Sequence, residues 1–305
     1  MLLEKSISFF INYLQNVQNY SPHTIRAYSS DLGHFVAYME ATRLEERVEI
    51  QLIDRQLLRG YLSFLYEKDL SKRSIHRAFA ALSSLFTYLT EHQILSKNPI
   101  DTIELPKQEK KIPDTVTRAM VEMFLTLPNL SSYLGLRDQA ILELLYSSGI
   151  RVGELVTLNR EHLHEGRRII KVLGKRGKER IVPITQTAWK AIVRYTNHPK
   201  YNRNTQALFL NGRGSRLTVR SIDRILLGYW KQSGFTHKIT PHTLRHSIAT
   251  HWLELGMNLK DIQSLLGHSS MMTTTIYTKV GQSLQKITYD KCHPFGKQKR
   301  EQEEQ

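Results

Sequence analysis

A charged stretch that contains two prolines divides the sequence, and it constrains the fold more than any other feature. It runs from Asp101 to Thr117, reads DTIELPKQEKKIPDTVT and shows little apolar periodicity. This composition is typical of a linker rather than of a helix or strand. A chain of 305 residues with 40% hydrophobic content can bury two ordinary cores. We therefore expect two domains, over residues 1–100 and 118–296, joined by a linker over 101–117.

The first 100 residues carry four amphipathic helical patterns. In SPHTIRAYSSDL, Ser21 is followed by Pro22, which is typical of a helix start because the first turn tolerates proline. Asp54 and Ser71 are expected to cap two further helices. The helical patterns end near Asn98. These features predict a small basic domain of four helices.

Beyond the linker the pattern is mainly helical, with one β-hairpin. The stretch RRIIKVLGKRGKERIVPI holds two β-branched runs around a densely basic turn over 174–177. Further helices are expected over Thr185–His198, Ser221–Gln232, Thr240–Gly256, Leu259–Leu266 and again after Ser283. The tail over 297–305 has almost no apolar content, so we expect it to be disordered. The predicted fold class is mainly α with a small β-sheet: an N-terminal four-helix domain followed by a C-terminal α+β domain.

The charge balance indicates the class of partner. The chain has 43 Lys plus Arg against 28 Asp plus Glu, a net charge of +15. This favours nucleic acid, with a membrane surface as the weaker alternative. The single Cys292 excludes an intrachain disulfide. Glu4 and Lys5 interrupt the apolar residues of the N-terminus, so no membrane span is expected there, and we expect a soluble, cytoplasmic protein.

The helix expected over Thr240–Gly256 gathers cationic side chains near its start. It reads TPHTLRHSIATHWLELG, with Thr240 as the N-cap, His242 in the first turn and Arg245 one turn later. A helix N-terminus favours anions, which makes a phosphate the expected ligand. An apolar stripe follows the same helix: Leu244, Ile248, Trp252 and Leu255. Because Arg245 lies beside this stripe, we expect it to be half-buried and to need an anionic partner.

Three further polar residues have ordinary structural explanations when each is taken alone. Arg151, in YSSGIRVGEL, lies three residues before Glu154, so a simple surface ion pair competes with a functional role. His268 follows the helix-terminating Gly267 in LLGHSS, where a histidine is usually just polar. Tyr277, in TTTIYT, could be a residue at the rim of a core.

Metal and nucleotide chemistry find little support. His242 and His246 form an i,i+4 pair, but the glutamate of the zinc-binding H-E-x-x-H pattern is missing and Arg245 would lie beside the cation. The sequence also lacks a G-x-x-x-x-G-K-[ST] loop and a serine-nucleophile elbow. We therefore expect no metal and no cofactor.

Taken together, five stretches resemble the catalytic boxes of the tyrosine recombinases, the phage integrase family, in order and spacing: GIRVGEL, GKRGKER, PHTLRHSIATH, LLGHSS and TTTIYT. SPHTIRAYSSDL resembles the N-terminal core-binding domain of that family, and YDKCHP resembles its C-terminal end. The likeness is greatest to the bacterial Xer type, and YDKCHP favours XerC over XerD without deciding between them. The resemblance implies site-specific cutting and rejoining of duplex DNA, with a core-binding domain and a catalytic domain clamped around the helix.

The resemblance implies a role for each matching residue. Tyr277 would attack the scissile phosphate and form a 3′-phosphotyrosyl bond with release of a 5′-hydroxyl. Arg151 and Arg245 would hold the non-bridging oxygens, and His268 would add a donor to the same phosphate. Because the ester keeps the energy of the cleaved bond, rejoining would need neither ATP nor a metal.

Proton transfer is implied for two more residues. His242 matches the general acid/base of the family, and Lys175 matches the lysine that protonates the leaving 5′-oxygen. The turn departs from the family pattern at Arg176, which makes Lys178 a rival for the acid role. The segment SSMMTTTIYTKV also departs from the usual version, although its spacing to Tyr277 is unchanged.

The resemblance also implies an assembly. Two protomers would bind opposite half-sites and four would form a synapse, with two copies each of this chain and of a related partner recombinase, and with a DNA translocase as a candidate activator. Chromosome-dimer resolution is the expected duty. A mobile-element integrase, a type IB topoisomerase-like enzyme and a non-catalytic DNA-binding protein of the same fold remain open.

The C-terminal segment Ser283–Phe295 offers an apolar face through Leu284, Ile287 and Tyr289. In the family that the chain resembles, such a helix leaves its own domain and docks on a neighbouring protomer. We expect the same here, with a helix packed on its own core as the alternative. Truncation after Gly281 would then weaken assembly more than stability.

Overall fold

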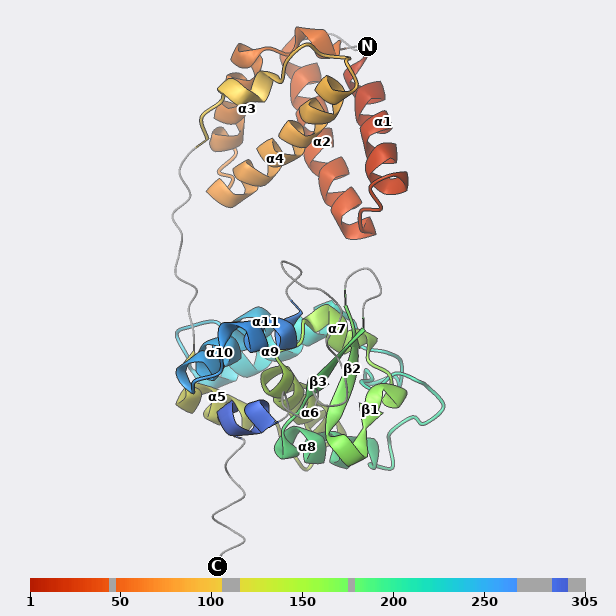
Figure 1. The fold of residues 1–305 in the computed structure, drawn as a ribbon, viewed down its shortest axis with the longest axis vertical. Coiled ribbons are helices and arrows are strands. Elements are labelled where there is room, and N and C mark those ends of the chain that lie inside the picture. Colours follow the sequence, from red (N-terminus) through yellow and green to blue (C-terminus); the bar gives the residue numbers. More distant parts are fainter. Residues whose placement is uncertain (44–47, 106–115, 175–178, 268–286, 296–305) are drawn as a thin grey trace, which may run out of the picture. The chain divides into compact units, whose positions relative to one another are not determined.

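The structure is a computed structural model that describes residues 1–43, 48–105, 116–174, 179–267 and 287–295. The chain divides into two compact units, Met1–Lys111 and Ile112–Gln305 (Figure 1). Each unit buries its own apolar core.

The N-terminal unit is helical. Its elements are α1 (Leu3–Asn16), α2 (Pro22–Arg43), the 3₁₀ helix η1 (Ile50–Leu52), α3 (Arg55–Glu67), α4 (Lys72–Glu91) and the 3₁₀ helix η2 (Pro99–Thr102). The side chains of Ser21, Asp54 and Ser71 each accept the backbone N–H three residues later, which satisfies a donor that a helix start leaves unpaired. The predicted four helices and their caps are confirmed.

Both ends of the segment expected as a linker contact a core. Ile103 and Leu105 pack against the N-terminal core. At the other end, Val116 is buried and its backbone N–H donates to Ser247 Oγ at 3.0 Å within the C-terminal unit. Residues 106–115 lie outside the described part of the chain.

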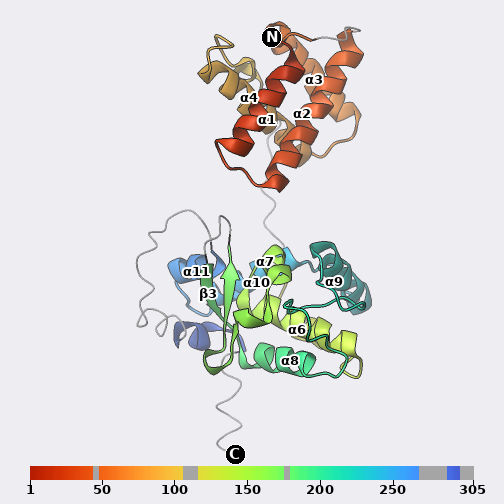
Figure 2. The same cartoon turned by 90° about the vertical axis from the view of Figure 1, so that its right-hand side faces the viewer.

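The C-terminal unit combines helices with one small sheet (Figure 2). Its longer elements are α5 (Arg118–Leu125), α6 (Tyr133–Ser148), α7 (Val152–Thr157), β1 (Leu163–His164), β2 (Ile169–Leu173), β3 (Glu179–Pro183), α8 (Gln186–Thr196), α9 (Val219–Ser233), α10 (Pro241–Glu254) and α11 (Leu259–Leu266), with 3₁₀ helices η3 (Arg160–His162) and η4 (Glu165–Arg167). The sheet is antiparallel in the order β1-β2-β3, with Lys171 opposite Ile181. The expected hairpin is confirmed as β2 and β3, while its basic turn over 175–178 lies outside the described residues.

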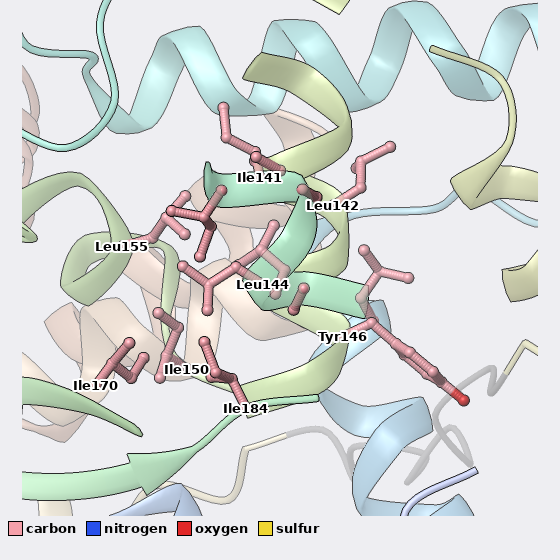
Figure 3. Packing of buried hydrophobic residues seen from close by; sticks show 14 of the residues in the cluster. Ile141, Leu142, Leu144, Tyr146, Ile150, Leu155, Ile170 and Ile184 are labelled. Atoms are coloured by element: carbon pink, nitrogen blue, oxygen red, sulfur yellow. The ribbon is translucent and has the colours of Figure 1, made fainter. Parts of the chain in front are cut away.

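Helix α6 lies at the centre of this unit and packs against both α8 and α10. Figure 3 shows Ile141 and Leu144 of α6 packed with Ile150, Ile170 and Ile184, all of them fully buried. Burying one such side chain stabilises the fold by about 1.5–3 kcal/mol. A buried helix of this kind gives the surrounding elements a rigid support.

The C-terminal segment packs on its own unit. Residues 287–292 are helical, Tyr289 and His293 are buried, and the Tyr289 hydroxyl donates to the carbonyl of Ser147 at 2.7 Å. Ile287, expected on the apolar face, is 63% exposed, and Leu284 lies outside the described residues. In this structure residues 287–295 therefore follow the alternative, a segment packed on its own core, because the buried tyrosine closes the core of its own chain.

Candidate active site

Arg245 is anchored in the interior at the start of α10. Thr240 caps this helix by accepting the Thr243 N–H at 3.0 Å, as predicted. The Arg245 side chain donates to the carbonyls of Gly149 and Leu266, the second at 2.7 Å, and it is only 8% exposed. Among the residues that the structure describes, its direct partners are therefore carbonyl oxygens, and no carboxylate directly neutralises the guanidinium.

The apolar stripe of α10 is nearly as predicted. Leu244, Ile248 and Trp252 are fully buried. Leu255 is 46% exposed, because it is the C-cap residue at which the helix ends. Burial of the other three fixes the rotation of α10 and thereby directs Arg245 inward.

Arg151 is the N-cap of α7 and is positioned by the turn that ends α6. Gly149 forms this turn with φ of +60°, and a Cβ there would lie 2.8 Å from Leu266 Cδ2, so a residue with a side chain would be strained at this position. The Arg151 guanidinium donates to the carbonyls of Leu266 and Gly267 at 3.4 and 3.3 Å. Arg151 and Arg245 therefore share Leu266 O as an acceptor, which brings two guanidinium groups together at the end of α11.

Sequence reasoning missed the partner that completes this cluster, Arg180 of β3. Glu154 is 7% exposed and receives a two-pronged ion pair from Arg180 at 2.7 and 2.8 Å. Arg151 also pairs with Glu154, at 3.2 Å through its side chain and at 2.7 Å through its backbone N–H. The predicted surface pair thus exists, but its carboxylate is buried. A charged residue inside the β-branched run ERIVP is the signal that could have indicated Arg180.

The cluster has more positive than negative charge. Burial by itself raises the pKa of Glu154, but the hydrogen bonds and charge of Arg180, assisted by Arg151, outweigh burial and hold that pKa below its usual value. Burial, followed by the charge of Arg151, lowers the pKa of Arg245 to about 10. Three guanidinium groups around one carboxylate leave a surplus that an anion such as a phosphate can neutralise.

The other predicted site residues are distributed as follows. His242 is exposed in the first turn of α10, three residues before Arg245. Lys175, its rival Lys178, His268 and Tyr277 lie outside the described residues. Among the residues that the structure describes, no group of three or more His, Cys, Asp or Glu side chains could hold a metal.

Comparison with known proteins identifies the family. The phage integrase family matches residues 114–283, and the N-terminal SAM-like domain of phage integrases matches residues 7–93. The chain is 41% identical to tyrosine recombinase XerC of Chlamydia caviae, over 93% of this chain and 97% of that protein. It is 40% identical to tyrosine recombinase XerC of Syntrophus aciditrophicus, over 96% of this chain and 98% of that protein.

Solved structures support the same fold. The integrase of transposon Tn1549, solved in complex with circular intermediate DNA, aligns with a TM-score of 0.70 at 20% identity, over 93% of this chain and 99% of that one. The XerH site-specific recombinase, bound to a palindromic difH substrate, aligns with a TM-score of 0.67 at 23% identity, over 92% and 83%. Within the described part of this chain, no helix is long and apolar enough to span a bilayer. The chain belongs to the phage integrase family, as a site-specific tyrosine recombinase similar to the XerC proteins.

Proposed function

We propose that this recombinase cuts and rejoins duplex DNA through a covalent bond to Tyr277. The Tyr277 oxygen attacks the scissile phosphorus, a P–O bond forms to the tyrosine, and the P–O5′ bond breaks. Lys175, or its rival Lys178, donates the proton that the leaving 5′-oxygen takes up, and His242, as general acid/base, accepts the proton that the Tyr277 hydroxyl loses. Arg151, Arg245 and His268 bind the non-bridging oxygens.

One observation carries this proposal: the guanidinium groups of Arg151 and Arg245 donate to the same carbonyl, that of Leu266. Two like charges held together are unfavourable unless an anion joins them. The carbonyl belongs to the last residue of α11, two positions before His268 in the sequence. A phosphodiester has two non-bridging oxygens that share its negative charge, and this pair of acceptors suits a pair of guanidinium donors.

A covalent-trapping experiment tests the nucleophile. A duplex that carries the bound site is nicked beside the cleavage position, so that rejoining is prevented, and the products are resolved on a denaturing gel. Tyr277→Phe should bind this duplex with normal affinity and form no adduct, whereas the control Tyr66→Phe, an exposed tyrosine of the N-terminal unit, should form it normally. An adduct with Tyr277→Phe would overturn the assignment.

We also propose a duty and an assembly. The duty is chromosome-dimer resolution in the cytoplasm, carried out by a synapse of two copies of this chain and two of a related recombinase, with a DNA translocase as activator. The similarity to proteins named XerC over nearly the whole chain supports this. A single binding site on the chromosome of its own cell, found by footprinting, would support the proposal. Sites confined to a mobile element would favour an integrase instead.

A further inference from the structure

We propose that Arg180 is a positioning residue that holds the carboxylate of Glu154 and so leaves Arg151 free to bind the scissile phosphate. This inference rests on the proposed role of Arg151. It concerns a residue on the sheet, far along the chain from both site arginines.

Arg180 is nearly buried, and its contacts lie within the protein. Its side chain is 10% exposed. Its two Nη atoms donate to the two oxygens of Glu154, and its Nε donates to the carbonyl of Leu265 at 3.0 Å. All three nitrogens of the guanidinium thus have partners inside the protein, and the group acts through them rather than on a ligand.

Glu154 is saturated by these contacts. One of its oxygens accepts Arg180 at 2.7 Å and the Arg151 side chain at 3.2 Å, and the other accepts Arg180 at 2.8 Å and the Arg151 backbone N–H at 2.7 Å. The shorter side-chain bonds are those of Arg180. Arg151 is consequently bound to Glu154 by one longer side-chain bond and stays 38% exposed.

The competition between the two arginines decides where the Arg151 charge is directed. Without Arg180, Arg151 would be the one described arginine still hydrogen-bonded to the buried carboxylate, and an Arg–carboxylate pair favours the two-pronged geometry. Arg151 would then turn toward Glu154 and away from the phosphate. Arg180 prevents this because it already occupies both carboxylate oxygens.

Arg180 also contacts the end of α11. Three atoms of its guanidinium lie 3.1 Å from the position that a Cβ on Gly267 would occupy, and Gly267 has φ of +67°. Gly267 O is in turn an acceptor for Arg151. One side chain therefore contacts both the carboxylate and the backbone turn that border Arg151.

The test compares two trapping duplexes, one with the natural scissile phosphate and one with a neutral methylphosphonate in its place. A residue that supports binding of the charged oxygens should matter far less on the neutral group. We expect Arg180→Met to slow adduct formation at least about tenfold on the phosphate, less than the ~10²–10³-fold loss of a direct donor, and to change the methylphosphonate rate by less than about threefold. Arg180→Lys, which keeps the charge but not the fork, should fall between.

Two further variants separate the outcomes. Arg137→Lys alters a buried arginine–carboxylate pair elsewhere in the same unit and should affect both duplexes equally. The double variant Glu154→Gln with Arg180→Met removes the competing charge and should recover part of the rate on the phosphate duplex. The same double variant tests the proposal if Arg180→Met alone fails to fold.

Arg151→Ala, measured in parallel, separates a failure of the proposed role of Arg151 from a failure of the proposed role of Arg180. If Arg151→Ala loses both rates equally, the proposed role of Arg151 is wrong. If Arg151→Ala discriminates between the duplexes and the Arg180 variants do not, only the role of Arg180 is overturned. The role of Arg180 is also overturned if Arg137→Lys slows the phosphate duplex more than the methylphosphonate duplex, as strongly as the Arg180 variants do.

Discussion

Two buried arginine–carboxylate clusters in the C-terminal unit have similar parts and opposite electrostatics. In the first, Arg137 and Asp138 pair at 2.7 Å, are 6% and 7% exposed, and are joined by the Tyr229 hydroxyl at 3.0 Å from the carboxylate. In the second, Glu154 is surrounded by the side chains of Arg151 and Arg180. One cation per carboxylate makes the first cluster neutral, whereas the second, with Arg245 nearby, has a positive surplus.

The two clusters shift the pKa values of their carboxyl groups in opposite directions. Burial raises the pKa of Asp138, and the opposing effects of Arg137 and Tyr229 do not overcome it. Burial acts in the same direction on Glu154, but the arginines there reverse the sign and lower its pKa. A neutral pair is sufficient to hold two elements together. A surplus of guanidinium groups is unfavourable for the fold alone and becomes favourable when an anion binds, so it indicates a functional site.

The largest effect is expected from removing the C-terminal segment, which belongs to neither cluster. Its loss measures how much stability the burial of uncharged side chains provides. Truncation after Gly281 removes Tyr289 and His293, both buried, together with the hydroxyl bond to Ser147. Since one buried aromatic contributes about 3–5 kcal/mol, the unfolding free energy of this unit should fall by more than about 5 kcal/mol. Chemical denaturation with full-length protein as control measures this. An unchanged midpoint with weaker assembly on DNA would restore docking on a neighbour.

Breaking the neutral cluster should mainly affect stability. Arg137→Met leaves Asp138 buried with Tyr229 as its remaining partner in the described ranges, and we expect the unfolding free energy to fall by about 3–5 kcal/mol. The double variant Arg137→Met with Asp138→Leu should recover most of this loss, because it leaves no buried charge. Urea denaturation measures the unfolding free energy of both variants. If Arg137→Met is as stable as the parent, the Arg137–Asp138 cluster does not stabilise the fold as described.

Breaking the positive cluster should mainly affect activity. Arg245→Met removes a guanidinium whose only direct partners in the described part of the chain are carbonyls, so the unfolding free energy should change by no more than about 1 kcal/mol. Adduct formation should fall by ~10²–10³-fold, as for loss of one oxyanion donor. Single-turnover trapping measures the rate and thermal denaturation the stability. A collapse of stability equal to that of Arg137→Met would remove the distinction between the clusters.

The smallest effect is a contrast in pH dependence. The folded pKa of Glu154 is lowered, so its contribution is present above the ordinary glutamate pKa and is lost as pH falls through the folded value. The folded pKa of Asp138 is raised, so stability increases as pH falls through that value. Measured from pH 7 downward, the stability advantage of the parent over Glu154→Gln should shrink, and its advantage over Asp138→Asn should grow. Parallel slopes for both variants would contradict the assigned directions.

Much of the local structure could be predicted because its determinants lie within a few residues. Asp54 and Thr240 cap helices through hydrogen bonds to the backbone three residues ahead. Gly149 and Gly267 end helices with a positive φ, which glycine adopts at lower cost than residues with a Cβ. The Arg151–Glu154 pair is also local. The order of the catalytic boxes, together with these local signals, was sufficient for the family, while the roles of the site arginines stay a prediction.

What the sequence determined by itself was therefore the four N-terminal helices, the helices α8 to α11, the hairpin and the chemical types in the candidate site. Only the tertiary structure decided which groups meet: Arg180 with Glu154, 26 residues apart, Arg245 with the Gly149 carbonyl, 96 apart, and Tyr289 with Ser147, 142 apart. Bonds within one helical turn follow from backbone geometry that the residue types control. Bonds between distant segments depend on how whole elements pack, which no local pattern specifies. For this reason the contacts of Arg180 and the packing of residues 287–295 became visible only in the folded chain.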